Sequence, residues 1–455
     1  MGFLASTNGT LGRAPDVSHE TGPQNLTNRK VGVDRVLKFR TAIKQLVRQR
    51  RVLLVGVALS VSAIVIAACG GGGDSDDPSP SGPSETVAPS DQAEIELTAA
   101  VADGWSAIPI TEGIKPALAL GPDEAPAIAY LFESLSEGFV GFASASEGWV
   151  ADNFVEGYFY GPLDLVIDAA GEPNIVYHDH QDLQFDQSKG DLAFAVRGGG
   201  QWQSEAVSDD GHDGWDSALV LAPDGVRHAF GVDPSQFGST DGVEHYSYVD
   251  GSWTVTAIGS GAIKYEFNVS PALAPDGNPA VSYFNDREGD LMYAKYDGTT
   301  WAIETVAAEG DVGKFSSLQI DSQGTPHIAF YEETGASTGV VQYASRIDGE
   351  WQIEEIATLD DVELGMLGAR RITSLALGSD GEPRVAFSDR SSLFYAVRDA
   401  DGWTVEEIVS AASLSLGQLV SLKVDAANAP HIAYYEVTGL SPLSGVIGYL
   451  TTRLE

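Results

Sequence analysis

Acidic residues recur along the chain at intervals of 46 to 57 residues, each after a short apolar run. They are Glu133, Asp179, Asp233, Asp286, Glu332, Asp389 and Glu436. Hard cations such as calcium prefer several oxygen ligands, so convergent carboxylates would form a cation-binding collar. Alternatively, each side chain accepts hydrogen bonds from its own loop backbone. Both interpretations stay open, and a bound calcium is one of them.

Several of the expected loops carry aromatic residues: Tyr158, Phe159, Tyr160, Trp215, Tyr265 and Phe267. Aromatic side chains can stack on sugar rings or anchor a protein partner, and they can equally fill the space beneath their own loops. From both sets we predict a ligand-binding site, made of Trp215, Tyr160, Tyr265, Asp179, Glu332, Asp389 and Glu436.

Histidines suggest a second kind of chemistry. His178 and His180 flank Asp179, with His212 and Asp213 further on, and an extended chain would place the two imidazoles on one face as metal ligands require. A third ligand at a recognisable spacing is missing, so the metal content stays unknown. Two of the 62 acidic residues after residue 52 could form a glycosidase pair, which only their separation would reveal. We assign no catalytic residue.

The elements that must position these residues are marked by seven tryptophans, 44 to 53 residues apart. They are Trp105, Trp149, Trp202, Trp253, Trp301, Trp351 and Trp403, and Trp215 lies outside the series. A fixed period with an aromatic at a fixed phase is typical of a repeat architecture. A second aromatic series lies on the expected third strand of each repeat: Phe142, Phe194, Tyr246, Tyr293, Tyr343, Tyr395 and Tyr449.

Each repeat predicts four short antiparallel strands. An apolar run ends in a turn such as Asp380-Gly381, and a Pro-x-Ile/Val-Ala-Tyr/Phe run such as 383–387 follows. The third and fourth strands carry the aromatic and the tryptophan. The last repeat stops after its third strand, whereas Trp105 begins a fourth-type strand before any first strand. We therefore predict an all-β, seven-bladed β-propeller, closed by an N-terminal strand that completes the last blade.

In such blades the 2–3 and 4–1 connections share one face of the disc. Here they are long and varied, whereas the 1–2 and 3–4 turns are short. Binding residues concentrate on loops held by a rigid scaffold, so we expect the long-loop face to carry the function.

The N-terminal region predicts export. Residues 1–51 are basic, residues 52–68 form an apolar segment, and the chain continues Cys69-Gly70. Ile66-Ala67-Ala68-Cys69 resembles a bacterial lipobox, in which the cysteine is lipid-modified. An uncleaved transmembrane anchor is the alternative. Gly70 favours the outer membrane by analogy with sorting rules. Residues 69–97 hold the cysteine and a Gly/Pro/Ser/Asp-rich linker, and 98–455 the propeller.

Charge narrows the choice of partner. After residue 52 the chain has 16 Lys/Arg against 62 Asp/Glu, a net charge of −46. Phosphate contacts need clustered Lys/Arg, so we do not expect a nucleic-acid partner.

The repeat resembles secreted bacterial β-propellers with S-L-A-L-x-x-D-G-x-P-x-I-A-Y-like units. The segments that carry the resemblance are Ser374–Leu377, Asp380–Pro383 and Val385–Phe387. It is also loosely similar to sialidase-type propellers, although those normally have six blades and an arginine triad, which this sequence does not show. The resemblance implies the propeller fold.

These observations favour a lipid-anchored, monomeric envelope protein whose long-loop face binds a glycan or an envelope protein. A polysaccharide hydrolase or lyase that uses carboxylates or calcium on that face is the alternative. A purely structural role is a third possibility. The membrane contact would be made through the N-terminal lipid alone.

Overall fold

The computed structural model divides the chain into two compact units, residues 1–88 and 89–455. It describes residues 95–453 except 134–137, 181–189, 209–213, 215, 233–241, 260–268, 361, 363–370, 412–415, 417–418 and 441–442. Among the described residues, no helix is long and apolar enough to cross a membrane. The predicted signal segment and Cys69 lie outside the described residues.

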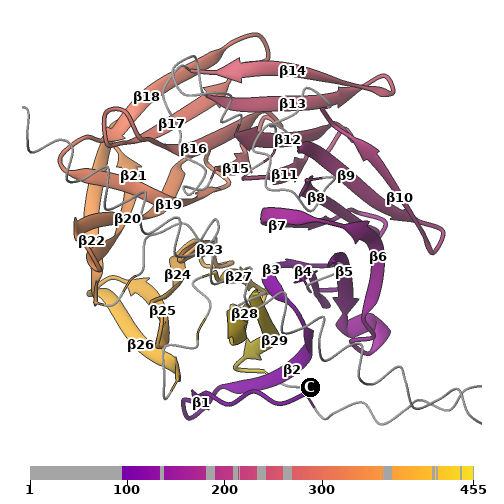
Figure 1. Cartoon of the computed structure of the whole chain (residues 1–455). Coiled ribbons are helices and arrows are strands. Elements are labelled where there is room, and N and C mark those ends of the chain that lie inside the picture. Colours follow the sequence, from indigo (N-terminus) through magenta and orange to yellow (C-terminus); the bar gives the residue numbers. More distant parts are fainter. Residues whose placement is uncertain are drawn as a thin grey trace, which may run out of the picture. The chain divides into compact units, whose positions relative to one another are not determined.

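The second unit is a seven-bladed β-propeller, as the sequence predicts, with the blades arranged in a ring (Figure 1). Blade 1 consists of β3 (Ile114–Leu120), β4 (Pro126–Glu133), β5 (Gly138–Ser144) and β6 (Asp152–Gly157). Blade 2 consists of β7 (Phe159–Ile167), β8 (Pro173–Asp179), β9 (Asp191–Gly198) and β10 (Gln201–Ala206). Blade 3 consists of β11 (Ala218–Leu221), β12 (Arg227–Val232), β13 (Val243–Val249) and β14 (Ser252–Ile258). One short 3-10 helix, η1 (Ala145–Glu147), precedes β6.

Blade 4 consists of β15 (Ser270–Leu273), β16 (Pro279–Asn285), β17 (Asp290–Tyr296) and β18 (Trp301–Ala307). Blade 5 consists of β19 (Asp311–Ile320), β20 (Pro326–Gly335), β21 (Thr338–Ile347) and β22 (Glu350–Asp360). Blade 6 consists of β23 (Thr373–Leu377), β24 (Pro383–Ser388), β25 (Ser392–Asp399) and β26 (Gly402–Ser410). Blade 7 holds β27 (Ser421–Val424), β28 (Pro430–Leu440) and β29 (Leu443–Thr451). Its outer strand is β2 (Ser106–Glu112), which pairs antiparallel with β29 and closes the ring.

The N-terminal segment also pairs with blade 6, a contact that the sequence did not predict. Strand β1 (Ala100–Val101) adds a fifth strand to blade 6 by pairing with β26. Just before it, the backbone N–H and hydroxyl of Thr98 and the N–H of Ala99 donate to the buried carboxylate of Glu436 in blade 7, at 2.8, 2.7 and 3.1 Å. The segment therefore spans blades 6 and 7 before it completes the ring.

The tryptophans pack each blade onto the one before it. The ring of Trp403 meets Tyr343 of blade 5 edge-on, with centroids 5.3 Å apart, and Trp351 meets Tyr293 of blade 4 at 5.6 Å. Four of the seven indole N–H groups also donate to a carboxylate on the fourth strand of the preceding blade; they belong to Trp105, Trp202, Trp253 and Trp403. The regular tryptophan series therefore joins neighbouring blades, since aromatic pairs prefer such edge-to-face contacts.

Candidate functional site

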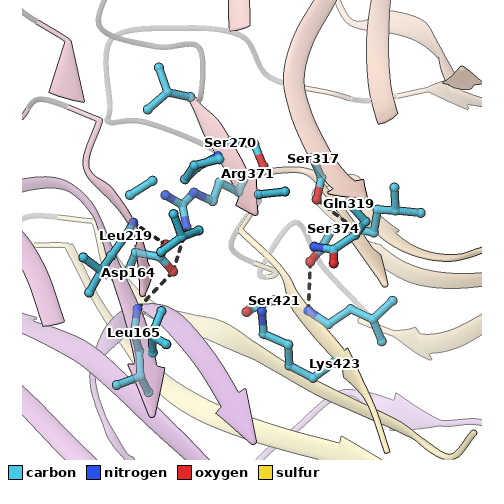
Figure 2. Close-up of a pocket in the computed structure, with 18 of the residues that line it drawn as sticks. Asp164, Leu165, Leu219, Ser270, Ser317, Gln319, Arg371, Ser374, Ser421 and Lys423 are labelled. Carbon is cyan, nitrogen blue, oxygen red and sulfur yellow. Dashed lines mark hydrogen bonds and ion pairs between the residues drawn. The ribbon is translucent and has the colours of Figure 1, made fainter. Parts of the chain in front are cut away.

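The first strands of blades 2 to 7 surround a pocket of about 320 Å³ in the middle of the ring (Figure 2). Ligand sites typically measure about 300–1,000 Å³, so the pocket has room for one small group such as a single sugar ring. Asp164, Arg371 and Lys423 contribute its charged groups. Further polar side chains line it: Ser270, Ser317, Gln319, Thr373, Ser374 and Ser421. Each first strand begins at a 4–1 connection, so one end of this pocket lies toward the face that carries these connections. They are long before β11, β15, β23 and β27, as expected, but only one to three residues long before β3, β7 and β19.

Serine hydroxyls at one position of the first strands join consecutive blades. We call Ser270, Ser317, Ser374 and Ser421 the hydroxyl ring; each accepts a hydrogen bond at 2.9–3.0 Å from the backbone N–H of a leucine in the next blade. Between blades 3 and 4 both partners are missing together: Ala218 has no hydroxyl and Pro271 has no N–H. No backbone donor is therefore left without its acceptor at that junction.

Asp164 takes the place of the serine in blade 2. Its Oδ2 accepts the N–H of Leu219 in blade 3 at 2.9 Å, as a serine would, and its Oδ1 accepts the N–H of Leu165 at 3.0 Å. A carboxylate at this position adds a negative charge to the pocket while it keeps the contact between the blades.

Arg371 reaches across the ring from blade 6 toward blades 2 and 3. Its Nη2 donates to the carbonyl oxygen of Ser217 at 2.9 Å, and its Nη1 to that of Leu163 at 3.5 Å. The same nitrogens lie 3.9 Å from carboxylate oxygens of Asp164 and Asp216. Figure 2 shows the guanidinium beside Asp164. A planar guanidinium suits such a multiple contact, which fixes one side of the pocket.

Asp216 is almost completely buried beside Arg371, with 1% of its surface exposed. Its Oδ2 accepts the N–H of Val269 at 2.9 Å. Burial raises the pKa of this carboxyl to about 6, because desolvation penalises the charged form more than Arg371 favours it. The group therefore changes its protonation state near neutral pH.

Lys423 departs from the repeat. At the equivalent position of the first strand, two residues after the hydroxyl ring, five blades have Ala119, Val166, Val220, Ala272 and Ala376, and blade 5 has Gln319. The lysine side chain extends into the pocket and makes no hydrogen bond or ion pair with the described residues (Figure 2). Burial lowers its pKa, and Asp164 partly opposes this effect. Although enclosed by protein, its ammonium remains accessible to the pocket space.

The structure gives several predicted carboxylates local partners. Asp389 accepts the backbone N–H groups of Ser391 and Ser392 at 2.8 and 2.7 Å, the turn chemistry named above as an alternative. Glu436 holds the N-terminal segment, and Glu332 accepts from the amide of Gln342 at 2.7 Å. Asp179 ends β8 and is half-buried. Their part in ligand binding remains a prediction.

The predicted aromatic residues are only partly placed. Tyr160 lies in β7, paired with His178, but its side chain, like all of Trp215 and Tyr265, lies outside the described residues. Asp216, next along the chain from Trp215, reaches Arg371. His178 and His180 are buried in blade 2. Across the described ranges, no group of three His, Cys, Asp or Glu residues could hold a metal ion; Asp233, His212 and Asp213 lie outside them.

One sequence match to a nucleophile motif has a different structure. Gly335-Ala-Ser-Thr-Gly339 fits the Gly-x-Ser-x-Gly pattern, yet it forms the hairpin turn between β20 and β21. The motif works in a strand-to-helix elbow, so this serine is not such a nucleophile.

Asp164, Asp216, Arg371 and Lys423 are not among the site residues expected from the sequence. A signal was available for two of them: Asp164 and Lys423 replace the serine and the small apolar residue that other blades have at the same positions. Aligning the first strands position by position would have identified both.

No model of a protein family and no curated protein sequence matches this chain. Among solved structures, a polysaccharide lyase of family PL25, an ulvan lyase bound to -[GlcA(1-4)Rha3S]-, is similar to it with a TM-score of 0.50 and 12% identity, over 72% of this chain and 93% of the lyase. The Aleuria aurantia lectin in complex with Fucalpha1-6GlcNAc matches with a TM-score of 0.44 and 16% identity, over 67% and 98%.

A leech intramolecular trans-sialidase matches with a TM-score of 0.43 and 10% identity, over 65% of this chain and 68% of that one. At these identities the likeness concerns the fold. The chain has the propeller architecture that these proteins share.

Proposed function

We propose that the protein is a glycan-binding module of the bacterial cell envelope, whose ligand contacts the long-loop face and enters the central pocket. The observation that carries this proposal is the convergence of Asp164, Arg371 and Lys423 in one pocket. Residues common to all blades build the ring. Asp164 and Arg371 also make contacts between blades, but Lys423 makes no hydrogen bond or ion pair with the described residues, and five blades have an uncharged Ala or Val where it stands.

The size and polarity of the pocket agree with a sugar ligand. A volume of about 320 Å³ suits one residue of a chain, and hydroxyl, carboxylate, guanidinium and ammonium groups can all bond to sugar hydroxyls. The predicted aromatic residues Trp215, Tyr160 and Tyr265 would hold the neighbouring sugars. The ulvan lyase, whose fold is similar, is bound to -[GlcA(1-4)Rha3S]-.

The test is binding of the full chain to a panel of envelope and extracellular polysaccharides. Trp215→Ala and Tyr265→Ala should each weaken binding by about 5- to 140-fold, because a stacking contact contributes on the order of 1–3 kcal/mol. Val150→Ala, an exposed residue in the short turn before β6, is the control and should bind like the wild type. Unchanged binding in both aromatic variants would refute the site, and binding to no glycan would refute the function.

A polysaccharide-processing enzyme is the second candidate, and Asp216 favours it. A carboxyl with a pKa of about 6 beside an arginine can exchange a proton at neutral pH, as a general acid or base must. Turnover of a polysaccharide by the wild type, lost in Asp216→Asn while binding persists, would establish catalysis. Binding without turnover across the panel would exclude it.

For localisation we propose a lipid anchor on Cys69. Export by the segment 52–68 and acylation of the cysteine would leave residues 70–97 as the tether to the propeller. Metabolic labelling with palmitate should mark the wild type in the membrane fraction. Label retained by Cys69→Ser would rule out this anchor.

A further inference from the structure

The central pocket presents hydrogen-bond donors with few competing acceptors. Each serine of the hydroxyl ring already accepts a backbone N–H through its oxygen, and its own proton has no acceptor among the described residues. A serine hydroxyl in this state offers mainly its O–H. Four such donors therefore line the pocket, at consecutive blades from 4 to 7.

Two more donors stand one step further along the first strands. Lys423 in blade 7 and Gln319 in blade 5 line the same pocket, and the side chain of neither makes a hydrogen bond within the described part of the chain. Figure 2 shows both side chains with the hydroxyl ring beside them. Lysine has three N–H donors and no acceptor, and the glutamine amide adds two donors beside its one carbonyl acceptor.

The acidic side chains near the pocket already have hydrogen-bond or ion-pair partners. Both oxygens of Asp164 accept backbone N–H groups, and Arg371 lies 3.9 Å from it. Asp216 pairs with Arg371 on the same side. The ammonium of Lys423 is thus the cation of the pocket that has no carboxylate within ion-pair distance in the described structure. An unpaired charge away from bulk water is costly unless an opposite charge joins it.

We propose that the pocket is an oxyanion site, in which Lys423, Gln319 and the hydroxyl ring bind a carboxylate or a sulfate. This inference rests on the proposed function only in taking the oxyanion to be part of a glycan, such as a uronic acid or a sulfated sugar. Charge-assisted hydrogen bonds from ammonium and hydroxyl groups select such a group over a neutral sugar. The negative charge of the chain opposes the approach of anions, so binding depends on these local donors.

The test is calorimetric titration of the full chain with sodium sulfate, sodium glucuronate and neutral glucose at constant ionic strength. We expect at least one of the two oxyanions to bind and glucose not to bind. Lys423→Ala should weaken oxyanion binding at least about tenfold. This variant installs the residue found at three equivalent positions, so the fold should persist; Lys423→Gln, which copies blade 5, is the second choice. Lys295→Ala, a half-exposed lysine paired with Asp276 outside the pocket, is the matched control.

The outcomes separate this site from the broader function. Oxyanion binding lost in Lys423→Ala but kept in Lys295→Ala supports the site, even if no polysaccharide binds. A polysaccharide that binds the wild type and Lys423→Ala equally well, or the failure of both oxyanions to bind, overturns the site and leaves the glycan-binding proposal to its own test.

Discussion

Trp403 and Trp351 form a natural matched pair for measuring what the indole N–H contributes between blades. Both are half-buried and meet a tyrosine of the preceding blade edge-on, at 5.3 and 5.6 Å with interplanar angles of 68° and 70°. They differ in two respects. The guanidinium of Arg346 lies over the Trp351 ring, 5.0 Å from its centroid, a contact that a phenylalanine ring can also make. The second difference is the partner of the indole N–H. The Nε1 of Trp403 donates to Glu354 at 3.1 Å, whereas that of Trp351 is buried without an acceptor in the described structure.

Replacement by phenylalanine removes the N–H and part of the ring in both cases. The loss of ring area is similar, so it cancels in the comparison. A hydrogen bond to a charged group contributes about 1.5–3 kcal/mol, and water screens part of this because 35% of the Glu354 side chain is exposed. We therefore expect Trp403→Phe to lower the free energy of unfolding by about 1 kcal/mol more than Trp351→Phe does.

Urea denaturation followed by far-UV circular dichroism measures the difference, provided the m-values of the two variants agree. A double-mutant cycle of Trp403→Phe and Glu354→Ala measures the coupling energy of this pair, which should be favourable, whereas the cycle of Trp351→Phe and Glu354→Ala should give a coupling energy near zero. Equal losses in the two tryptophan variants, or a larger loss in Trp351→Phe, would refute the assignment of the N–H contact as a stabilising bond.

Three further predictions concern other parts of the ring. The pKa of Asp216 is raised from 3.8 to about 6 in the folded state, so the native state binds this proton more tightly than the unfolded chain does. The free energy of unfolding should therefore fall by up to about 3 kcal/mol as the pH rises from about 4 to 6. Asp216→Asn should flatten this part of the curve of unfolding free energy against pH. Glu436→Ala removes the acceptor of the hydrogen bonds from Thr98, so limited proteolysis should cut the N-terminal segment faster than in the wild type; an unchanged rate would contradict the contact. Ser374→Ala leaves the N–H of Leu422 without its acceptor and should cost about 1 kcal/mol in urea denaturation, whereas no loss would mean that the hydroxyl ring does not stabilise the blade junctions.

The sequence by itself was sufficient for the architecture. Strand patterns and turns are local properties, and Asp380-Gly381 shows how: the glycine has φ of 80° and the aspartate accepts the N–H of Glu382 at 3.1 Å. Because the same pattern occurs seven times, the number of blades could be counted. The missing fourth strand of the last repeat likewise predicted the closure that β2 provides.

The candidate site depended on the tertiary structure. Closure of the ring brings Arg371 to Ser217 and Leu163, which lie 154 and 208 residues earlier in the chain. No local sequence pattern predicts such a contact, because the contact depends on which blades face each other across the centre of the ring. The loop residues were predicted from the general rule that loops carry function. That rule does not identify a charged side chain on a first strand, such as Lys423.

The sequence thus determined the blade, the count and the closing strand, since hydrophobic alternation and turn chemistry act within one repeat. Only the closed ring determines which of the residues that depart from the repeat lie close together. Lys423 and Asp164 stand 259 positions apart and look like isolated substitutions in the sequence. In the ring they line one pocket, because the first strands of blades 2 to 7 surround the same central space.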